Sequence, residues 1–87
     1  MKSGDLAHLL GEVRRLGEAQ AVSGDLAAAR VSFRRAVEKD RRDWTLWFEL
    51  ATASRGAARE RALAQASRLN PLSPEIGDFR EQIGGGA

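Results

Sequence analysis

Two stretches of the chain repeat one another, and this self-similarity restricts the possible folds more than any other feature. At a spacing of 34 residues the matched pairs are Val13 with Trp47, Leu16 with Leu50 and Gly17 with Ala51. At a spacing of 30 residues they are Phe33 with Leu63, Ala36 with Ala66 and Asp40 with Asn70. Such a period is typical of helical hairpins that stack side by side. The second unit is four residues shorter, about one helical turn, so its apolar stripe stays in phase.

The composition and the turn residues favour helices alone. The strongest helix formers supply 15 Ala and 10 Leu, whereas the β-branched residues Val and Ile supply only six positions together. Gly24 and Gly56 are expected to break helices, and Asp25, Asp43 and Ser73 are expected to cap the helices that follow. The five expected helices span about Asp5–Val22, Leu26–Lys39, Trp44–Arg55, Ala57–Leu69 and Pro74–Gln82.

Each of the last four helices carries one apolar stripe that is expected to face the core. The stripes are Leu26, Ala29, Phe33, Ala36 and Val37; Trp44, Trp47, Leu50, Ala51 and Ser54; Ala58, Ala62, Leu63, Ala66 and Leu69; and Ile76, Phe79 and Ile83. Within the third helix, Trp47 and Leu50 are predicted to be core residues. Small residues such as Gly17 let two helix backbones approach, and Phe33 is expected to fill the remaining gap.

These positions resemble the tetratricopeptide repeat family. The first unit supplies the family pattern at Val13, Leu16, Gly17, Gly24, Ala29, Phe33 and Ala36, and the second supplies it at Trp47, Leu50, Ala51, Leu63, Ala66 and Pro71. The chain departs from the pattern where Arg41 replaces the usual closing Pro, where Arg59 replaces a small residue and where Leu63 replaces an aromatic one. The resemblance covers about residues 10–71, and residues 73–83 are similar to the helix that ends such arrays.

The resemblance implies an all-α fold of antiparallel helix hairpins stacked as a right-handed superhelix of about five helices. The expected single domain covers residues 1–83, with the first repeat at about 10–43, the shortened second repeat at about 44–72 and the end helix at about 74–83. Residues 84–87 are expected to be a flexible tail. Two repeats and an end helix are few for a stable array. We therefore expect either a fragment of a larger protein or a segment that associates with itself.

A second resemblance concerns the origin of the segment. The Ala- and Arg-rich composition, the helix at 44–51 and the ending at 68–75 look like the C-terminal repeat segments of bacterial O-antigen ligase-like membrane proteins. The chain itself has no apolar run of membrane-spanning length, and its first residues are not those of a signal peptide. The sequence thus predicts a soluble segment, cytoplasmic if it stands alone and membrane-associated if it belongs to a polytopic protein.

The residue types leave little room for catalysis or metal binding. The chain has no Cys and only one His, so a thiolate nucleophile and a multi-histidine metal site are excluded. His8 is expected to be a solvated helix residue. Asp40 and Asp43 flank a turn and are expected to cap helices and to pair with Arg41 or Arg42. The Gly84–Gly86 run follows no strand and precedes no helix, unlike a phosphate-binding loop. We predict that the chain is not an enzyme and binds no cofactor or metal.

The resemblance to tetratricopeptide repeats implies a function in binding a protein or peptide. By resemblance, the first helices of successive repeats line a concave face, whose candidate residues here are Arg14, Glu18, Thr45, Phe48, Thr52 and Arg55. The alternative for Phe48 is simple packing on the first or fifth helix. Some family members clamp a peptide carboxylate on this face with Lys and Asn. That activity is not carried over, because Glu18 stands where the Asn would be needed.

Two further functions remain open at this point. In the first, the chain forms homo-oligomers through the apolar surface of the first helix, with Leu6, Leu9 and Leu10 as candidate contacts. In the second, an edge rich in arginine on the second helix contacts nucleic acid or anionic lipid. Its residues are Arg30, Arg34, Arg35, Arg41 and Arg42. The net charge of only +2 and the neighbouring carboxylates favour a solvated, salt-bridged edge instead, so nucleic acid is the weaker expectation.

Overall fold

The computed structural model describes the backbone of residues 3–85 and the side chains of residues 11–84. This part of the chain is all-helical and contains no strand. The five helices are α1 (Ser3–Val22), α2 (Leu26–Lys39), α3 (Trp44–Thr52), α4 (Gly56–Leu69) and α5 (Pro74–Gly85). The predicted all-α character and the expectation of about five helices are confirmed for the described residues. No described helix is both long enough and apolar enough to cross a membrane.

Side chains and glycines at the turns set most of the helix ends. Asp25 accepts a hydrogen bond from the Ala28 N–H at 3.1 Å and caps α2, and Gly24 before it has a φ of +90°. Asp43 caps α3 by accepting from the Thr45 N–H at 3.0 Å. The Ser73 hydroxyl accepts from the Ile76 N–H at 3.3 Å. These three caps confirm the predicted helix starts.

Two helix ends differ from the prediction. α3 ends at Thr52 rather than near Arg55, because Arg55 has extended backbone angles and Gly56 turns the chain with a φ of +58°. The shortened second unit thus loses residues from its first helix, at a turn that a glycine can make. α5 continues to Gly85, so Gly84 and Gly85 are helical rather than part of a tail. The other residues expected in the tail, 86 and 87, lie outside the described residues.

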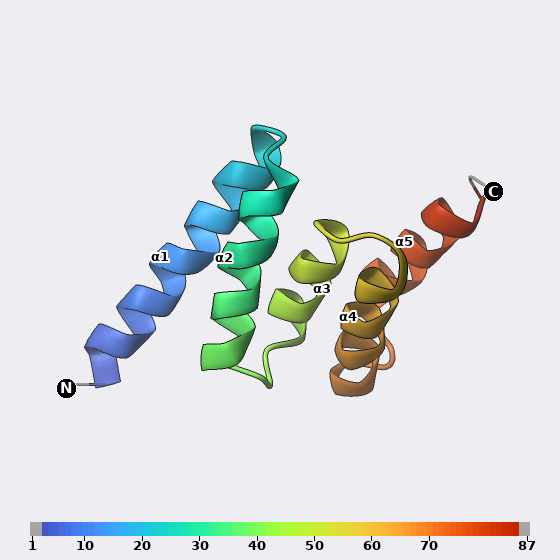
Figure 1. Ribbon diagram of the computed structural model, residues 1–87. Coiled ribbons are helices and arrows are strands. Elements are labelled where there is room, and N and C mark those ends of the chain that lie inside the picture. The colour runs from blue at the N-terminus through green and yellow to red at the C-terminus, as the bar shows by residue number, and fades with distance from the viewer. Residues whose placement is uncertain (1–2, 86–87) are drawn as a thin grey trace.

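The helices follow one another along the molecule, as Figure 1 shows from blue α1 to red α5. α2 packs against both α1 and α3, and α4 packs against both α3 and α5. The molecule is consequently elongated, with extents of 47 × 28 × 19 Å. A chain built in this way buries each helix mainly against its sequence neighbours.

The core lies between α2, α3 and α4. Its buried apolar residues are Ala29, Phe33, Ala36, Val37, Leu46, Leu50, Ala51, Ala53, Ala62, Leu63, Ala66 and Ile76. Phe79 and Ile83 of α5 pack against this cluster, as predicted. One expectation about the stripes holds in part and another is wrong. Trp47 packs against the core but is only half-buried, while the neighbouring Leu46 is 1% exposed, so the buried face of α3 is rotated toward Leu46. Leu69 is 37% exposed and does not belong to the core.

Matched positions of the two repeats have similar surroundings at the centre of each hairpin. Phe33 and Leu63 are both buried, and so are Ala36 and Ala66 and the pair Gly17 and Ala51. A second set of matched positions differs. Leu16 is 53% exposed whereas its counterpart Leu50 is 8% exposed, and Ala29 is fully buried whereas Arg59 is only half-buried. Matched residues at the centre of each hairpin are thus buried to a similar extent. Other matched residues are buried to different extents in the two units.

Gly17 of α1 lies directly against the Phe33 ring of α2 in the first hairpin. A Cβ atom placed on Gly17 would lie 2.8 Å from Cε1 of Phe33 and 3.0 Å from Cδ1 and Cζ of the same ring. Because real carbon contacts are longer, the ring occupies space that any other residue at position 17 would need. This confirms the predicted role of Gly17 and explains why α1 lies so close to α2.

We expect Gly17→Ala to destabilise the protein by about 1–3 kcal/mol, because overpacking against the Phe33 ring outweighs the better helix propensity of Ala. Gly77→Ala is the matched control, since Gly77 lies within helix α5 and a Cβ atom placed on it would have nothing within 4 Å. That change should stabilise by about 0.5–1 kcal/mol. Urea unfolding followed by tryptophan fluorescence measures both. Equal effects of the two substitutions would contradict the close packing at Gly17.

Candidate functional site

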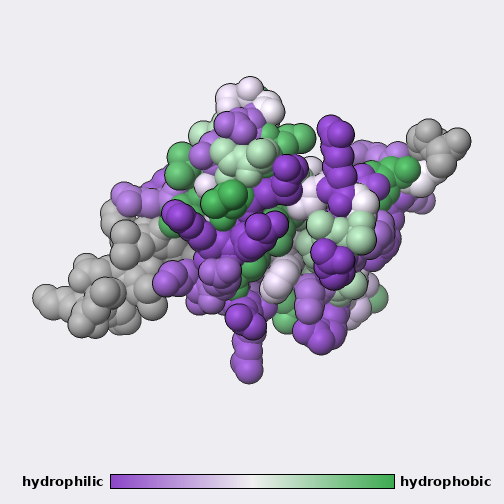
Figure 2. All heavy atoms as spheres, viewed as in Figure 1, coloured by the Kyte–Doolittle hydropathy of each residue, from purple (hydrophilic) through white to green (hydrophobic). Residues whose placement is uncertain are grey.

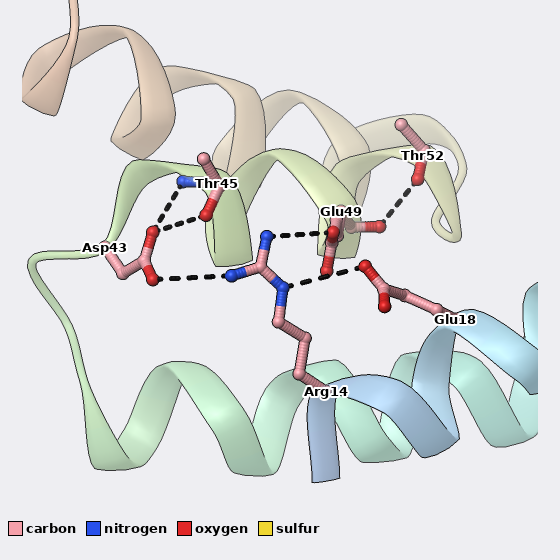
Figure 3. Close-up of polar contacts among 6 residues, drawn as sticks. All are labelled: Arg14, Glu18, Asp43, Thr45, Glu49 and Thr52. Atoms are coloured by element: carbon pink, nitrogen blue, oxygen red, sulfur yellow. Dashed lines mark hydrogen bonds and ion pairs between the residues drawn. The ribbon is translucent and has the colours of Figure 1, made fainter. Parts of the chain in front are cut away.

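The strongest cluster of charged side chains joins α1 to α3 through Arg14 (Figure 3). The Arg14 guanidinium donates from Nη2 to Oε1 of Glu49 at 3.1 Å. Its Nη1 lies 3.8 Å from Oδ2 of Asp43, and its Nε lies 3.6 Å from Oε2 of Glu18, one turn along α1. One cation therefore faces three carboxylates that come from α1, from the turn before α3 and from α3 itself.

The surroundings of Glu49 change its protonation. Burial raises the pKa of Glu49 to about 7, the nearby Glu18 carboxylate adds to the rise, and Arg14 opposes it without cancelling it. The Glu49 side chain is 20% exposed, and its Oε2 is buried with no hydrogen-bond partner in the described part of the chain. Burial lowers the pKa of Arg14, but the three carboxylates outweigh this effect and raise it above the ordinary value. Glu49 thus changes charge near neutral pH while Arg14 stays cationic.

Three of the six candidate concave-face residues belong to this cluster or touch it. Arg14 and Glu18 are members, and Thr45 donates its hydroxyl hydrogen bond to Asp43 (Figure 3). Thr52 lies at the far end of the same face of α3 and is exposed, with its hydroxyl donating to the Glu49 carbonyl oxygen at 2.7 Å. The contacts between the first helices of the two units are therefore made here by the long Arg14 side chain, which reaches Glu49 and Asp43.

The remaining two candidates lie elsewhere. Phe48 packs in a T-shaped contact with Phe79 of α5, at 5.7 Å between ring centres, and it also faces Trp44 at 6.1 Å. This is the alternative in which Phe48 packs on the fifth helix. Arg55 is exposed and lines a hollow of about 400 Å³ beside the α1–α2 turn, with Asp25 and Arg30.

Two members of the cluster were not anticipated as functional residues. Asp43 was expected only as a helix cap, and Glu49 carried no expectation at all. The spacing of Thr45, Glu49 and Thr52 held a signal, since residues four and three apart share one face of a helix. The cluster is not arranged as a metal site, because Arg14 occupies the space between the carboxylates. In the described part of the chain no three His, Asp or Glu side chains gather so as to hold a metal ion.

The arginine edge of α2 is not the salt-bridged surface that was expected. Arg30 donates to the Ala53 carbonyl oxygen at the end of α3, at 2.9 Å, and so connects the two hairpins. Arg34 makes no ion pair with Glu38 or with any other described carboxylate. Asp40 accepts from the Arg42 backbone N–H at 3.3 Å rather than from an arginine side chain. Arg34 lines a groove of about 460 Å³ between α2 and α4.

The candidate self-association residues Leu6, Leu9 and Leu10 have side chains outside the described part. The nearest described large apolar residue that is exposed on the same helix is Leu16, at 53%. Val22 at the end of α1 and Val31 on α2 are also exposed, at 90% and 49%. Figure 2 shows hydrophobic residues reaching the surface over the α1–α2 end of a mainly hydrophilic face.

The chain matches no family model, no curated protein and no solved structure.

The raised pKa of Glu49 predicts a fall in stability as pH rises from about 5 to about 8. The folded protein favours the protonated carboxyl, so the contribution is complete below the ordinary pKa of Glu and is lost as pH passes about 7. We expect a loss on the order of 2 kcal/mol, since one pKa unit corresponds to about 1.4 kcal/mol and partial exposure screens the charge. Glu49→Gln keeps the shape of the neutral form and should flatten this slope.

Urea unfolding across this pH range measures the effect, with His8→Gln in every protein because an imidazole also titrates there. Glu38→Gln, at an exposed site on α2, is the matched control and should keep the slope of the parent. A parent protein whose stability is flat or rises over the range would contradict the account. The same holds for a Glu49→Gln variant that retains the slope.

Proposed function

We propose that the chain is a non-catalytic protein-interaction module of the tetratricopeptide repeat kind. In this proposal the two hairpins and α5 stack as a short right-handed superhelix, and the segment belongs to a larger protein or assembly. The proposal is supported by the repeat spacing and by the equal burial of matched residues, such as Phe33 with Leu63 and Ala36 with Ala66. It is also supported by the order of packing, in which each helix meets its sequence neighbours.

The observation that carries the proposal is the unequal exposure of Leu16 and Leu50. α3, which bears Leu50, packs between α2 on one side and α4 on the other. α1, which bears Leu16, packs on α2, and Leu16 stays 53% exposed in the described part of the chain. The two residues occupy matched positions of the repeat, so the exposed surface of α1 is shaped for a helix that packs on it as α2 packs on α3.

A second copy of the chain is one occupant that fits this surface. Leu16, Val22 and Val31 are the exposed large apolar residues in the described part of the first hairpin, and burying apolar area stabilises association by about 25 cal/mol per Å² before the costs of association. A two-fold contact between two such surfaces closes on itself and does not extend into fibres. Homo-oligomerisation is therefore the second candidate function, through the same helix.

The proposal predicts association that depends on Leu16. Sedimentation velocity from low to high micromolar concentration should show the wild type forming a dimer or larger species, because α1 carries uncovered apolar surface. Leu16→Glu should remain monomeric, since a carboxylate on that surface would have to be buried in the contact. Leu72→Glu is the matched control at a residue that is 90% exposed in the α4–α5 turn, and it should associate like the wild type.

A wild type that stays monomeric throughout would show that the α1 surface does not bind a second copy. A Leu16→Glu variant that still dimerises while remaining fully helical by circular dichroism would place the contact elsewhere.

A further inference from the structure

The groove between α2 and α4 has features that neither the stacking of hairpins nor the α1 surface explains. It encloses about 460 Å³, with α3 at its floor. Trp47 and Leu50 of α3 and Ala58 and Ala62 of α4 provide its apolar lining. The groove remains open because the apolar residues that α4 contributes to its lining are alanines. Their side chains are too short to fill the space above α3.

Trp47 is held in a fixed position in this groove. Its indole Nε1–H donates to the Arg41 carbonyl oxygen at 2.9 Å, across the turn between α2 and α3. The ring is half-buried, so one part packs on the core and the rest is available to a ligand. A large aromatic ring whose polar atom is already satisfied is an anchor at which binding energy concentrates in protein interfaces.

The charges at the rim are of one sign. Arg34 from α2 and Arg61 from α4 line the groove, and no Asp or Glu lines it. Neither arginine forms an ion pair within the described part of the chain, and the Glu60 carboxylate beside Arg61 in sequence is paired with Arg80 at 3.4 Å. Guanidinium groups bind carboxylates through paired, directional hydrogen bonds. An occupant that carries carboxylates would supply the partners that the rim lacks.

We propose that the α2–α4 groove binds an acidic segment of a partner protein, with an apolar side chain on Trp47 and carboxylates on Arg34 and Arg61. The apolar floor favours a protein segment over nucleic acid, because a sugar–phosphate backbone offers no apolar side chain and two arginines form no extended basic track. The arginines of this groove come from the second helices of the two units and its floor comes from α3, whereas Leu16 lies on α1. Binding here and self-association there are therefore independent.

The test uses the whole chain and a fluorescent synthetic peptide that has Leu and Phe at helical spacing among Glu residues. Fluorescence anisotropy should show saturable binding. Replacing every Glu of the peptide by Gln should weaken binding by about tenfold, because both ion pairs at the rim are lost. Replacing Leu and Phe by Ser should weaken binding by about tenfold or more, because the apolar contact with Trp47 is lost. Arg34→Glu/Arg61→Glu should weaken binding of the acidic peptide by about the same factor.

Two controls separate the proposal from a general effect of charge or folding. Arg35→Glu/Arg42→Glu makes the same change in net charge at exposed residues outside the groove and should leave binding within about twofold of the wild type. A peptide with Lys in place of Glu should bind the Arg34→Glu/Arg61→Glu variant better than it binds the wild type. Such a charge-swap rescue requires a folded variant.

Three outcomes would overturn the proposal. The first is no saturable binding of the acidic peptide by the wild type. The second is equal loss of binding in the groove variant and in the Arg35→Glu/Arg42→Glu control. The third is a single-stranded oligonucleotide that displaces the peptide and binds more tightly than it does. None of these outcomes bears on whether Leu16→Glu abolishes self-association.

Discussion

The Phe33 ring lies where a side chain on Gly17 would have to be, and this contact brings the first two helices together. Because the ring is 2% exposed and reaches the α1 backbone, α2 is held by α1 on one face while its Ala29, Ala36 and Val37 side chains pack into the core. In the second hairpin the matched residues Leu63 and Ala51 are both fully buried. Small residues at these points allow close helix approach, and α3 packs on the α2 face of the first hairpin.

The α1–α3 side of the molecule and its α2–α4 side differ in whether their polar and aromatic groups have partners within the chain. Between α1 and α3, Arg14 binds three carboxylates, and Phe48 packs on Phe79 of α5, so the row of first helices uses its polar and aromatic groups internally. Between α2 and α4, the side chains leave space, and Arg34 meets no carboxylate among the residues that line it. The resemblance to repeat proteins places binding on the first row. In this chain, however, the arginine without a carboxylate partner and the half-buried Trp47 favour binding in the groove between α2 and α4.

Sequence reasoning anticipated what depends on local chemistry. It placed the caps at Asp25, Asp43 and Ser73, because a capping side chain acts on a backbone only two or three residues away. It also identified the buried residues at the centre of each hairpin, such as Phe33 and Leu63, because a core position in one repeat predicts a core position in the other. It failed where burial depends on the neighbouring helix. The face of α3 is rotated toward Leu46 instead of Trp47, and helical spacing alone did not distinguish them.

The charged site was harder to predict for the same reason. Arg14 and Glu18 are adjacent on one helix, but the atoms that complete the cluster come from Asp43 and Glu49, 29 and 35 residues further along the chain from Arg14. Their meeting depends on how α3 lies against α1, which no local pattern encodes. The raised pKa of Glu49 is a further consequence of that packing, because burial is its largest cause.

Leu16 and Leu50 are the same residue at matched positions of the two repeats, and they differ in what covers them. The chain has no cysteine, so thiol labelling of Leu16→Cys, Leu50→Cys and Leu72→Cys variants measures coverage directly. At low protein concentration, the thiol at position 16 should react nearly as fast as the one at position 72, and the thiol at position 50 should react much more slowly. Raising the concentration should protect position 16 alone. A thiol at position 16 that is protected at every concentration, or one at position 50 that reacts as fast as that at position 72, would contradict the account.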